Sequence, residues 1–336
     1  MTNYIVIERI AVQNANCISG FTYGFPAITH FLGFVHALSR KLNMDFTGCA
    51  VISHQHQIHV YRPKKGAEWA FAQTKNPTAY EYQKTRSLGK APPIIEEGKM
   101  NMTVSLIIQN NSLIEGGKEG RERFKHELEK LCYQHRLAAG SIQRIHSIEL
   151  YSSNTEDEYK KIHRLIKRKL LPGFILIDRS ELLAEHFKQL KAENKNAELL
   201  DAWLDFSALK FKAEAVLEKY ETEITEKTKA KWSYVPKPAL GWLVPIMNGY
   251  KAISELYPAG KVKSVRDSSV PFCFVEAVQS IGEWKSLHRI NDFSETIWKY
   301  SYEPDWYLCK QNKAISSDIA QEEIIIENTD DFLATL

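Results

Sequence analysis

The sequence predicts an α+β protein in which a pair of helices covers one small sheet. Short β-branched apolar runs alternate with helical periodicity over the first 150 residues, in the order strand, helix, strand, long polar segment, strand, helix. This order is typical of a split βαβ arrangement. At 336 residues, the chain is long enough to bury a large core, in one elaborated domain or in two.

The first half supplies the strands and helices of this arrangement. Residues 4–12 (YIVIERIAV) predict a buried strand, and an asparagine-rich loop follows it. A helix is expected from Pro26, because proline is favoured in the first helical turn. Residues 49–62 and 102–109 predict two further strands, and residues 119–139 carry an amphipathic helix ending in RLAAGSI. The apolar stripe of the first helix comprises Ile28, Phe31, Leu32, Val35, Leu38 and Leu42.

A long polar segment, residues 62–93, separates the second and third strands. Its basic residues are interleaved with aromatic residues, which suits a nucleic acid because phosphates attract cations and unstacked bases stack on flat rings. A solvated loop with its aromatic rings folded back explains the composition equally well. The residues concerned are Arg62, Lys64, Lys65, Lys75, Lys84, Arg86 and Lys90 with Trp69, Phe71, Tyr80 and Tyr82.

The second half begins with a basic helix that Pro172 and Gly173 terminate. Residues 174–178 predict a short strand, and residues 180–232 predict a helical insertion that packs on the body or on a partner. Residues 236–250 are expected to form loop and turn, and residues 269–278 a strand-like run. We therefore divide the chain into a core over residues 1–150, which includes the 62–93 segment, and a second part over residues 151–336.

Two charged patterns have competing explanations. Lys160, Arg164, Lys167 and Arg168 fall along one face of the basic helix, which suits a polyanionic partner, but cations at an exposed helix end also suit the helix dipole. In the run HQHQIH, alternation places His54 and His56 on one side of a strand and His59 on the other. Surface-facing imidazoles are favoured over a zinc site there, because no nearby carboxylate or thiol has suitable spacing.

Composition excludes several classes of function. The net charge of +3 is too small to indicate a partner by itself. The N-terminus lacks the features of a signal peptide, and no window approaches the roughly 18 apolar residues of a membrane span, so a cytoplasmic location without membrane contact is expected. The five cysteines are scattered, which predicts reduced thiols, with no disulfide framework, metal or cofactor.

The sequence contains no nucleophile elbow, zinc-protease motif, phosphate-binding loop or paired-carboxylate motif, so an enzyme is not expected. A histidine could still act as general base in RNA cleavage. His30, His36 and His288 are the candidates, because each neighbours basic or glycine-rich sequence. An endoribonuclease therefore remains the alternative to a binding protein, and a pure protein scaffold built on the helical insertion is a third possibility.

Several separated stretches resemble the second subunit of the type I-F CRISPR surveillance complex, the Csy complex, which belongs to the repeat-associated RNA-binding proteins. The matches keep the order of the family from about residue 5 to residue 305. They are QNANCIS (13–19), GFPAITHFLGFVHALSRKL (24–42), RLAAGSI (136–142), KRKLLPGFILIDRSELL (167–183), GWLVPIMNGY (241–250), FVEA (274–277), GEW (282–284), HR (288–289) and EPD (303–305).

The resemblance implies an RRM-like, ferredoxin-type core with a protruding basic thumb, placed at the 62–93 segment. It also implies a non-catalytic subunit that binds the 5′ handle of the CRISPR RNA (crRNA), pairs with the large subunit and abuts the backbone filament subunit. Contact with target DNA would be indirect. The RNA-binding candidates carried by these stretches and by the basic residues near them are Asn14, Asn16, His36, Arg40, Lys41, Lys64, Lys65, Arg136, Ser141, Arg266, His288 and Arg289.

The sequence departs from the family pattern in three places. Cys17 ends the asparagine motif where alanine is common, and both residues are small. Cys273 precedes the FVEA stretch where a basic residue can occur, which puts an RNA contact from that position in doubt. Residues 185–235 match only loosely, so partner contacts cannot be assigned there.

Overall fold

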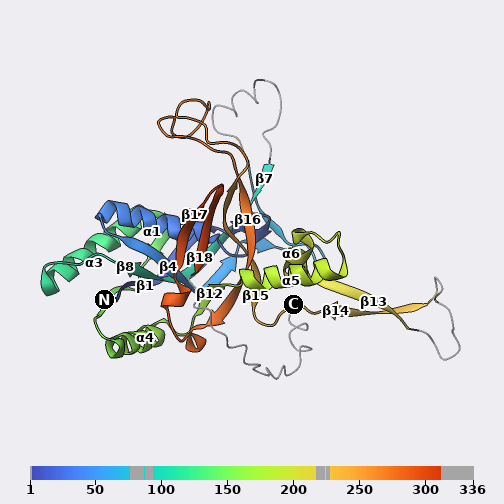
Figure 1. Ribbon diagram of the computed structural model, residues 1–336, viewed down its shortest axis with the longest axis horizontal. Coiled ribbons are helices and arrows are strands. Elements are labelled where there is room, and N and C mark those ends of the chain that lie inside the picture. The colour runs from blue at the N-terminus through green and yellow to red at the C-terminus, as the bar shows by residue number, and fades with distance from the viewer. Residues whose placement is uncertain (1, 76–86, 88–93, 217–223, 225–227, 312–336) are drawn as a thin grey trace.

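The computed structural model describes residues 2–75, 87, 94–216, 224 and 228–311. Its centre is one 11-stranded antiparallel sheet in the order β12-β16-β15-β18-β17-β4-β8-β1-β10-β9, with β11 also paired to β1 (Figure 1). Helices cover parts of both faces, so the predicted α+β class is confirmed. The strands are β1 (Thr2–Asn16), β4 (Phe46–Ile58), β8 (Lys99–Asn110), β9 (Arg136–Leu137), β10 (Gly140–Arg144), β11 (Ser147–Ser153), β12 (Phe174–Asp178), β15 (Leu243–Ala252), β16 (Val275–Ser286), β17 (Trp298–Glu303) and β18 (Trp306–Gln311).

In the first half, the chain order is β1, α1 (Ile28–Leu42), β4, β8, α3 (Gly117–Gln134) and β10–β11. Strand β8 lies between β4 and β1, and β11 pairs with the other edge of β1. Helices α1 and α3 share one face of these strands. The predicted stripe of α1 is buried there, with only Leu42 partly exposed, which explains why this sequence forms a helix at this place.

The opposite face is covered over part of its length by α4 (Glu156–Leu170). Thr155 caps α4 by accepting a hydrogen bond from the backbone N–H of Glu158, and three acidic residues in the first turn suit the helix dipole. Ile166 and Leu170 pack against Tyr4 and Ile52 of the sheet. The basic helix predicted from the sequence is therefore present, with its apolar stripe turned to the sheet.

The second half extends the same sheet. Strand β12 pairs with both β16 and β4, and β17 pairs with β4 at Trp298 and Cys49. Trp298 is fully buried and donates its indole N–H to the carbonyl oxygen of Leu176 at 3.0 Å. Helices α5 (Ser180–Glu193) and α6 (Leu199–Ser207) pack on β15 and β16 around Leu243 and Ile281. Two short 3₁₀ turns, η1 (Leu287–Arg289) and η2 (Ser294–Thr296), connect β16 to β17.

Smaller strands project from this body. Strands β2 (Ile18–Ser19) and β3 (Thr22–Tyr23) form a tight hairpin after β1. Strands β5 (Val60–Tyr61), β6 (Ala70–Lys75) and β7 (Ile94–Glu97) form a three-stranded sheet. Strand β6 lies within the predicted 62–93 segment and β5 and β7 flank it, and β7 points away from the body in Figure 1. Residues 76–86 and 88–93 of that segment lie outside the described residues.

The prediction of a helical insertion over residues 180–232 is wrong for its second part. After α5 and α6, the chain forms β13 (Lys210–Val216) and β14 (Lys229–Val235), a two-stranded ribbon that projects from the body (Figure 1). Charged residues alternate with apolar residues along β13, a period of two that specifies a strand. Residues 217–223 and 225–227 lie outside the described residues.

Two other boundaries differ from the prediction. The helix expected over 119–139 ends at Gln134, and the RLAAGSI stretch forms the β9–β10 hairpin instead. Residues 236–250 were expected to form loop and turn, but the chain from Leu243 to Ala252 forms strand β15. Gly249 is required there, because a Cβ atom would come within 2.2 Å of the carbonyl oxygen of Tyr307 on β18.

Candidate nucleic-acid interface

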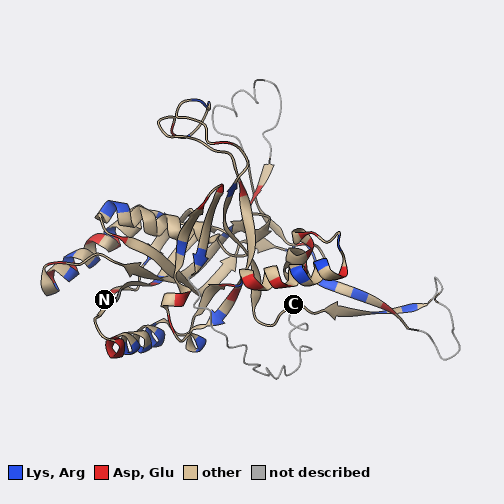
Figure 2. Cartoon of the chain, viewed as in Figure 1, with Lys and Arg blue, Asp and Glu red and all other residues tan. Residues whose placement is uncertain are grey.

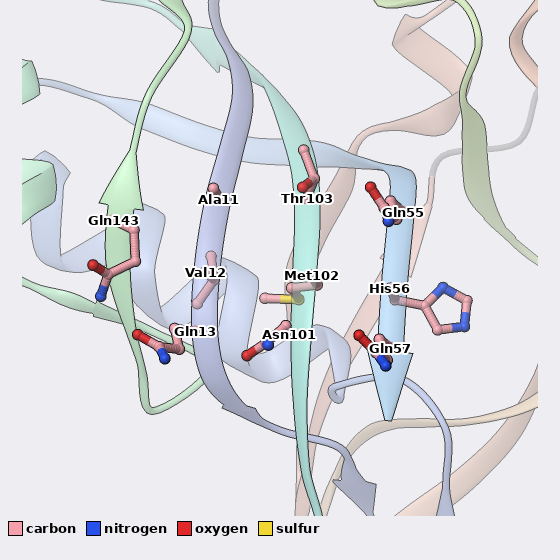
Figure 3. A pocket seen from close by; sticks show the side chains of 10 residues that line it. All are labelled: Ala11, Val12, Gln13, Gln55, His56, Gln57, Asn101, Met102, Thr103 and Gln143. Carbon is pink, nitrogen blue, oxygen red and sulfur yellow. The ribbon is translucent and has the colours of Figure 1, made fainter. Parts of the chain in front are cut away.

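The sheet face that carries α4 becomes polar beyond the end of that helix. A hollow of about 300 Å³ lies there across strands β10, β1, β8 and β4 (Figure 3). We call it the sheet hollow. It is lined by Ala11, Val12, Gln13, Gln55, His56, Gln57, Asn101, Met102, Thr103 and Gln143. Most of its polar side chains are exposed amides, so the hollow is rich in hydrogen-bonding groups and carries little charge.

Strand register sets this amide lining. Gln57 lies opposite Asn101, and Gln55 lies opposite Thr103, so these side chains share one face. Irregularities in register interrupt β4 between Ser53 and Gln55 and β1 between Ile7 and Ile10. Each extra residue reverses the side-chain alternation, which is how the glutamines reach the face that α4 covers farther along the strand.

The same bulge corrects the prediction for the histidine run. His54 lies on the face of α4, where its Nδ1 is 2.8 Å from the carbonyl oxygen of Pro172 and its Nε2 is 2.7 Å from Ser105 Oγ. His56 lies opposite Met102 and contacts Phe25 on the other face, and Figure 3 shows its ring turned away from Gln55 and Gln57. The two rings are therefore on opposite faces. Burial lowers the pKa of His54 below its usual value, so its ring is neutral at pH 7.

The structure brings four of the predicted residues together at one edge of the hollow. Ser141 pairs with Gln13 across β10 and β1, and Arg136 pairs with Ser141 across β9 and β10. Asn14 is exposed, and its backbone N–H donates to Asn101 Oδ1 at 3.1 Å. The side chain of Asn16 instead bonds to the backbone N–H and carbonyl of Ile18, so it serves the turn after β1.

Further cations lie around this end of the sheet. Lys64 and Lys65 are exposed in the turn after β5, just beyond the end of β4. Close by in sequence, the Arg62 guanidinium stacks 4.6 Å from the centre of the Trp69 ring. Arg144, which the sequence analysis missed, is exposed on β10 opposite Ala11. The hollow thus has an uncharged floor and basic surroundings.

Three predicted residues lie at the opposite end of the sheet. Arg40 and Lys41 are exposed in the last turn of α1, next to the start of β4, while the hollow lies near the end of β4. The 13 residues of β4 span roughly 40 Å at about 3.3 Å per residue. His36 is exposed two turns into α1 and contacts the ring of Tyr300. A single short ligand segment cannot contact these residues and the hollow at once.

The remaining predicted residues occupy two other places. His288 and Arg289 are exposed in η1, which contacts α4, and His288 Nδ1 lies 2.8 Å from Ser286 Oγ. Arg266 is exposed on the loop between β15 and β16, which projects from the body at the top of Figure 1. Of the candidate general bases, His30 and His36 both lie in α1, at its first turn and about two turns along, whereas His288 lies in η1.

The sequence analysis missed the amides of the hollow, which are Gln13, Gln55, Gln57, Asn101 and Gln143. A sequence pattern could have revealed these amides. Most of them neighbour a buried apolar residue in a strand, as Asn101 neighbours Met102 and Gln13 neighbours Val12. Glutamine and asparagine at alternate strand positions indicate a polar sheet face, but bulges hide how the rows from different strands align.

The arrangement is suited to binding a nucleic acid. Each amide offers both a donor and an acceptor, which matches the mixed edges of nucleobases. Exposed cations at the rim, such as Arg136 and Arg144, can neutralise phosphates without providing sequence information. Taken together, the polar sheet face and its basic rim define a candidate surface for a single-stranded nucleic acid.

Known proteins are similar to this chain over most of its length. A family model described as CRISPR-associated protein (Cas_Csy2) matches residues 5–309. The CRISPR-associated protein Csy2 of Pseudomonas aeruginosa (strain UCBPP-PA14) is 33% identical over 321 residues, which cover 90% of this chain and 92% of that protein. These matches place the chain among the CRISPR-associated proteins.

The chain belongs to the Csy2 family of type I-F CRISPR systems, which confirms the resemblance found in the sequence. The family provides a subunit of the type I-F CRISPR Cascade complex. No helix within the described residues combines the length and apolar character that a membrane crossing requires.

Proposed function

We propose that this protein is a non-catalytic RNA-binding subunit of the complex and that the sheet hollow binds bases of the crRNA 5′ handle. The observation that carries the proposal is the row of amides across four adjacent strands, bordered by Asn14, Ser141 and Arg136. In this proposal, splayed bases hydrogen-bond with Gln13, Asn101 and their neighbours, and the rim cations bind phosphates.

We further propose that the first half is an RRM-like, ferredoxin-type core. The strand order β4-β8-β1-β11, with α1 and α3 on one face, supports this proposal. In such cores, the face opposite the helix pair is the one that contacts RNA. Here that face is divided between α4 and the sheet hollow, so only the hollow remains open for bases.

The proposed setting is cytoplasmic, with the large subunit and the backbone filament subunit as protein partners and with target DNA contacted indirectly. The β13–β14 ribbon supports a protein partner. Its Phe211, Trp232 and Tyr234 face one way, and all three are exposed. The projecting β5–β7 sheet is the candidate for the thumb.

The central test replaces Gln13 and Asn101 together with alanine and measures binding of the handle RNA by fluorescence anisotropy. We expect about tenfold weaker binding, and a smaller preference for the handle over a scrambled RNA, because a good base contact contributes roughly 1–3 kcal/mol of discrimination. Gln134→Ala, at the exposed end of α3, is the matched control. Equal affinities for the double variant and this control would contradict the proposal.

A charge test determines how far the RNA extends. Arg136→Glu removes a rim cation of the hollow, and Arg40→Glu with Lys41→Glu removes the cations at the other end of the sheet. Each change weakens handle binding and flattens its salt dependence only where a phosphate is bound. If the α1 variant binds normally, the handle stays within the half of the sheet that holds the hollow.

Incubation with precursor crRNA tests the endoribonuclease alternative. We expect intact RNA. Metal-independent cleavage that His288→Ala abolishes would favour the alternative, since the ring of His288 is exposed and lies beside Ser286 Oγ.

A further inference from the structure

Helix α4 carries a row of cations that the sheet hollow does not use. Lys160, Arg164 and Lys167 follow one another at intervals of four and three residues, so they share one flank of the helix. Figure 2 shows Lys and Arg gathered along α4. The apolar stripe with Ile166 and Leu170 faces the sheet, so this basic flank is not needed to hold the helix in place.

A second hollow, of about 600 Å³, lies between this flank and the segment that follows η1. We call it the α4 pocket. The residues that matter for its chemistry are Lys160, His163, Arg164, Lys167, Asn291 and Asp292. The pocket therefore joins a helix flank to a loop that is distant in sequence, which gives it a fixed shape rather than an open charged surface.

A buried polar atom lines this pocket without a partner. His163 is only 4% exposed, and its Nε2 forms no hydrogen bond with any described residue. The nearest carboxylate oxygen, Asp292 Oδ1, is 3.9 Å away, beyond hydrogen-bond distance. The rings of Tyr159 and Phe293 hold the imidazole at centroid distances of 4.0 and 4.9 Å. Since an unpaired buried polar group costs about 1–3 kcal/mol, this nitrogen is suited to a ligand atom, and it donates to an anionic oxygen when the ring is protonated.

The acidic residues of the pocket already have donors. Asp292 Oδ1 accepts hydrogen bonds from Tyr159 Oη and from the backbone N–H of Ser294, and Glu156 pairs with Lys160 at 2.7 Å. Arg164 and Lys167, in contrast, form no ion pair with any residue that the structure describes. The cationic groups left for a ligand are therefore the guanidinium of Arg164 and the ammonium of Lys167.

We propose that the α4 pocket binds backbone phosphates of a nucleic-acid strand, with Arg164 and Lys167 at its rim and His163 at its base. Arginine matches phosphate oxygens with paired donors, and lysine adds a point charge. The row of cations along α4 continues the contact to a neighbouring phosphate. The pocket contacts backbone rather than bases, which distinguishes it from the sheet hollow, and it goes beyond the function proposed above. The strand can belong to the guide RNA or to duplex DNA.

The test uses the full chain assembled with its complex partners. Binding of a random-sequence duplex DNA is measured on the loaded complex, and binding of the guide RNA is measured in a separate arm. The variant combines Arg164→Glu with Lys167→Glu. Lys161→Glu is the control, because Lys161 is exposed on the same helix but does not line the pocket. Thermal unfolding of each variant verifies that it is folded.

We expect the pocket variant to bind one of these nucleic acids at least about tenfold more weakly and to lower the salt slope by roughly 0.7–0.9 for each lost phosphate contact. Weaker binding of duplex DNA identifies duplex DNA as the strand whose phosphates occupy the pocket. Weaker binding of the guide RNA identifies the guide RNA instead. His163→Phe, which keeps the ring packing but removes Nε2, is expected to weaken the same arm severalfold.

The proposal is overturned if neither arm changes, or if Lys161→Glu has the same effect per charge, because the result would then be a general effect of charge. A folded His163→Phe variant with unchanged binding would remove the histidine from the site. The residues of the sheet hollow remain intact in all these variants, so failure here does not affect the handle-binding proposal, and failure of the Gln13 and Asn101 test does not affect this one.

Discussion

At the residue scale, Gly140 determines how closely two strands approach at the sheet hollow. A Cβ atom there would lie 2.8 Å from both the Cα and the backbone N of Ala15 on β1, and 2.6 Å from Val12. Backbone atoms cannot move away as a side chain can, so no larger residue fits without displacing β1 from β10. The edge of the hollow, with Gln13 opposite Ser141, depends on this contact.

Gly140→Ala should therefore destabilise the fold by roughly 1–3 kcal/mol, as overpacking of a tight contact does. Gly33→Ala is the control, because Gly33 lies in α1 with no atom within 4 Å of the added Cβ, and alanine should stabilise that helix by up to about 1 kcal/mol. Urea denaturation measures both changes. Similar effects of the two variants would show that the contact at Gly140 is unimportant.

Buried histidines make the fold sensitive to acid. Burial lowers the pKa of His30, His54 and His163 below the ordinary value of 6.5. Between the lowered pKa values and 6.5, the unfolded chain binds more protons than the folded protein, so stability rises with pH in this window. The free energy of unfolding should therefore be greatest above pH 6.5 and should fall as the pH drops through the folded pKa values.

Denaturation at neutral and at mildly acidic pH measures this loss, above the range where most carboxylates titrate. His54→Gln should reduce the loss, because the variant has no imidazole to protonate between Pro172 and Ser105. Its stability at neutral pH should be lower than that of the natural chain, since glutamine cannot satisfy both partners in the same geometry. An unchanged pH dependence would exclude His54 as a cause.

At the element scale, the β13–β14 ribbon has two different faces. Cross-strand pairs place Phe211 with Tyr234 and Ala213 with Trp232 on one face, while Lys212, Glu214 and their partners occupy the other. Every residue of both strands is exposed. A ribbon with an unpaired aromatic face gains little stability on its own, which favours a partner that covers it.

Phe211→Ser with Trp232→Ser should leave the thermal stability of the chain nearly unchanged, because both side chains are more than half exposed. The same variant should weaken association with the large subunit at least about tenfold, since buried aromatic anchors dominate interfaces. Lys212→Ser on the opposite face is the control, and co-purification measures association. Full association of the aromatic variant would assign the ribbon another role.

At the scale of the whole molecule, Gln311 joins elements from different parts of the second half. Its Nε2 donates to the carbonyl oxygens of Leu176 and Thr296, and its Oε1 accepts from the backbone N–H of Asp178. The side chain is 8% exposed, so water cannot replace these bonds. It links β12, β18 and the end of η2, in the part of the sheet that pairs with β4 through β12 and β17.

Gln311→Ala should destabilise the protein by on the order of 2–3 kcal/mol, because it leaves buried backbone groups without partners. Since one sheet runs through both halves, tryptophan fluorescence and circular dichroism should still report one coincident transition. Gln134→Ala, at an exposed position, is the control. Two separate transitions would instead support independent domains divided near residue 150.

The sequence by itself determined the local structure wherever one periodicity was unbroken. The stripes of α1 and α4 and the apolar runs of β1 and β8 specify their elements, and separated motifs were sufficient to identify the family. Asn14, Arg136 and Ser141 were also named from sequence, because their motifs are short and local.

Only the tertiary structure decided which residues meet. Bulges in β1 and β4 reverse the alternation, so they separate His54 from His56 and align the glutamines into the sheet hollow. Arg40 and Lys41 lie beside the start of β4, far from the sheet hollow at the end of that strand, because a helix and the following strand run in opposite directions. The position of His163 beside Asp292 depends on packing between segments more than 120 residues apart. Local periodicity contains no information on such register and long-range packing, since these follow from the pairing of whole strands.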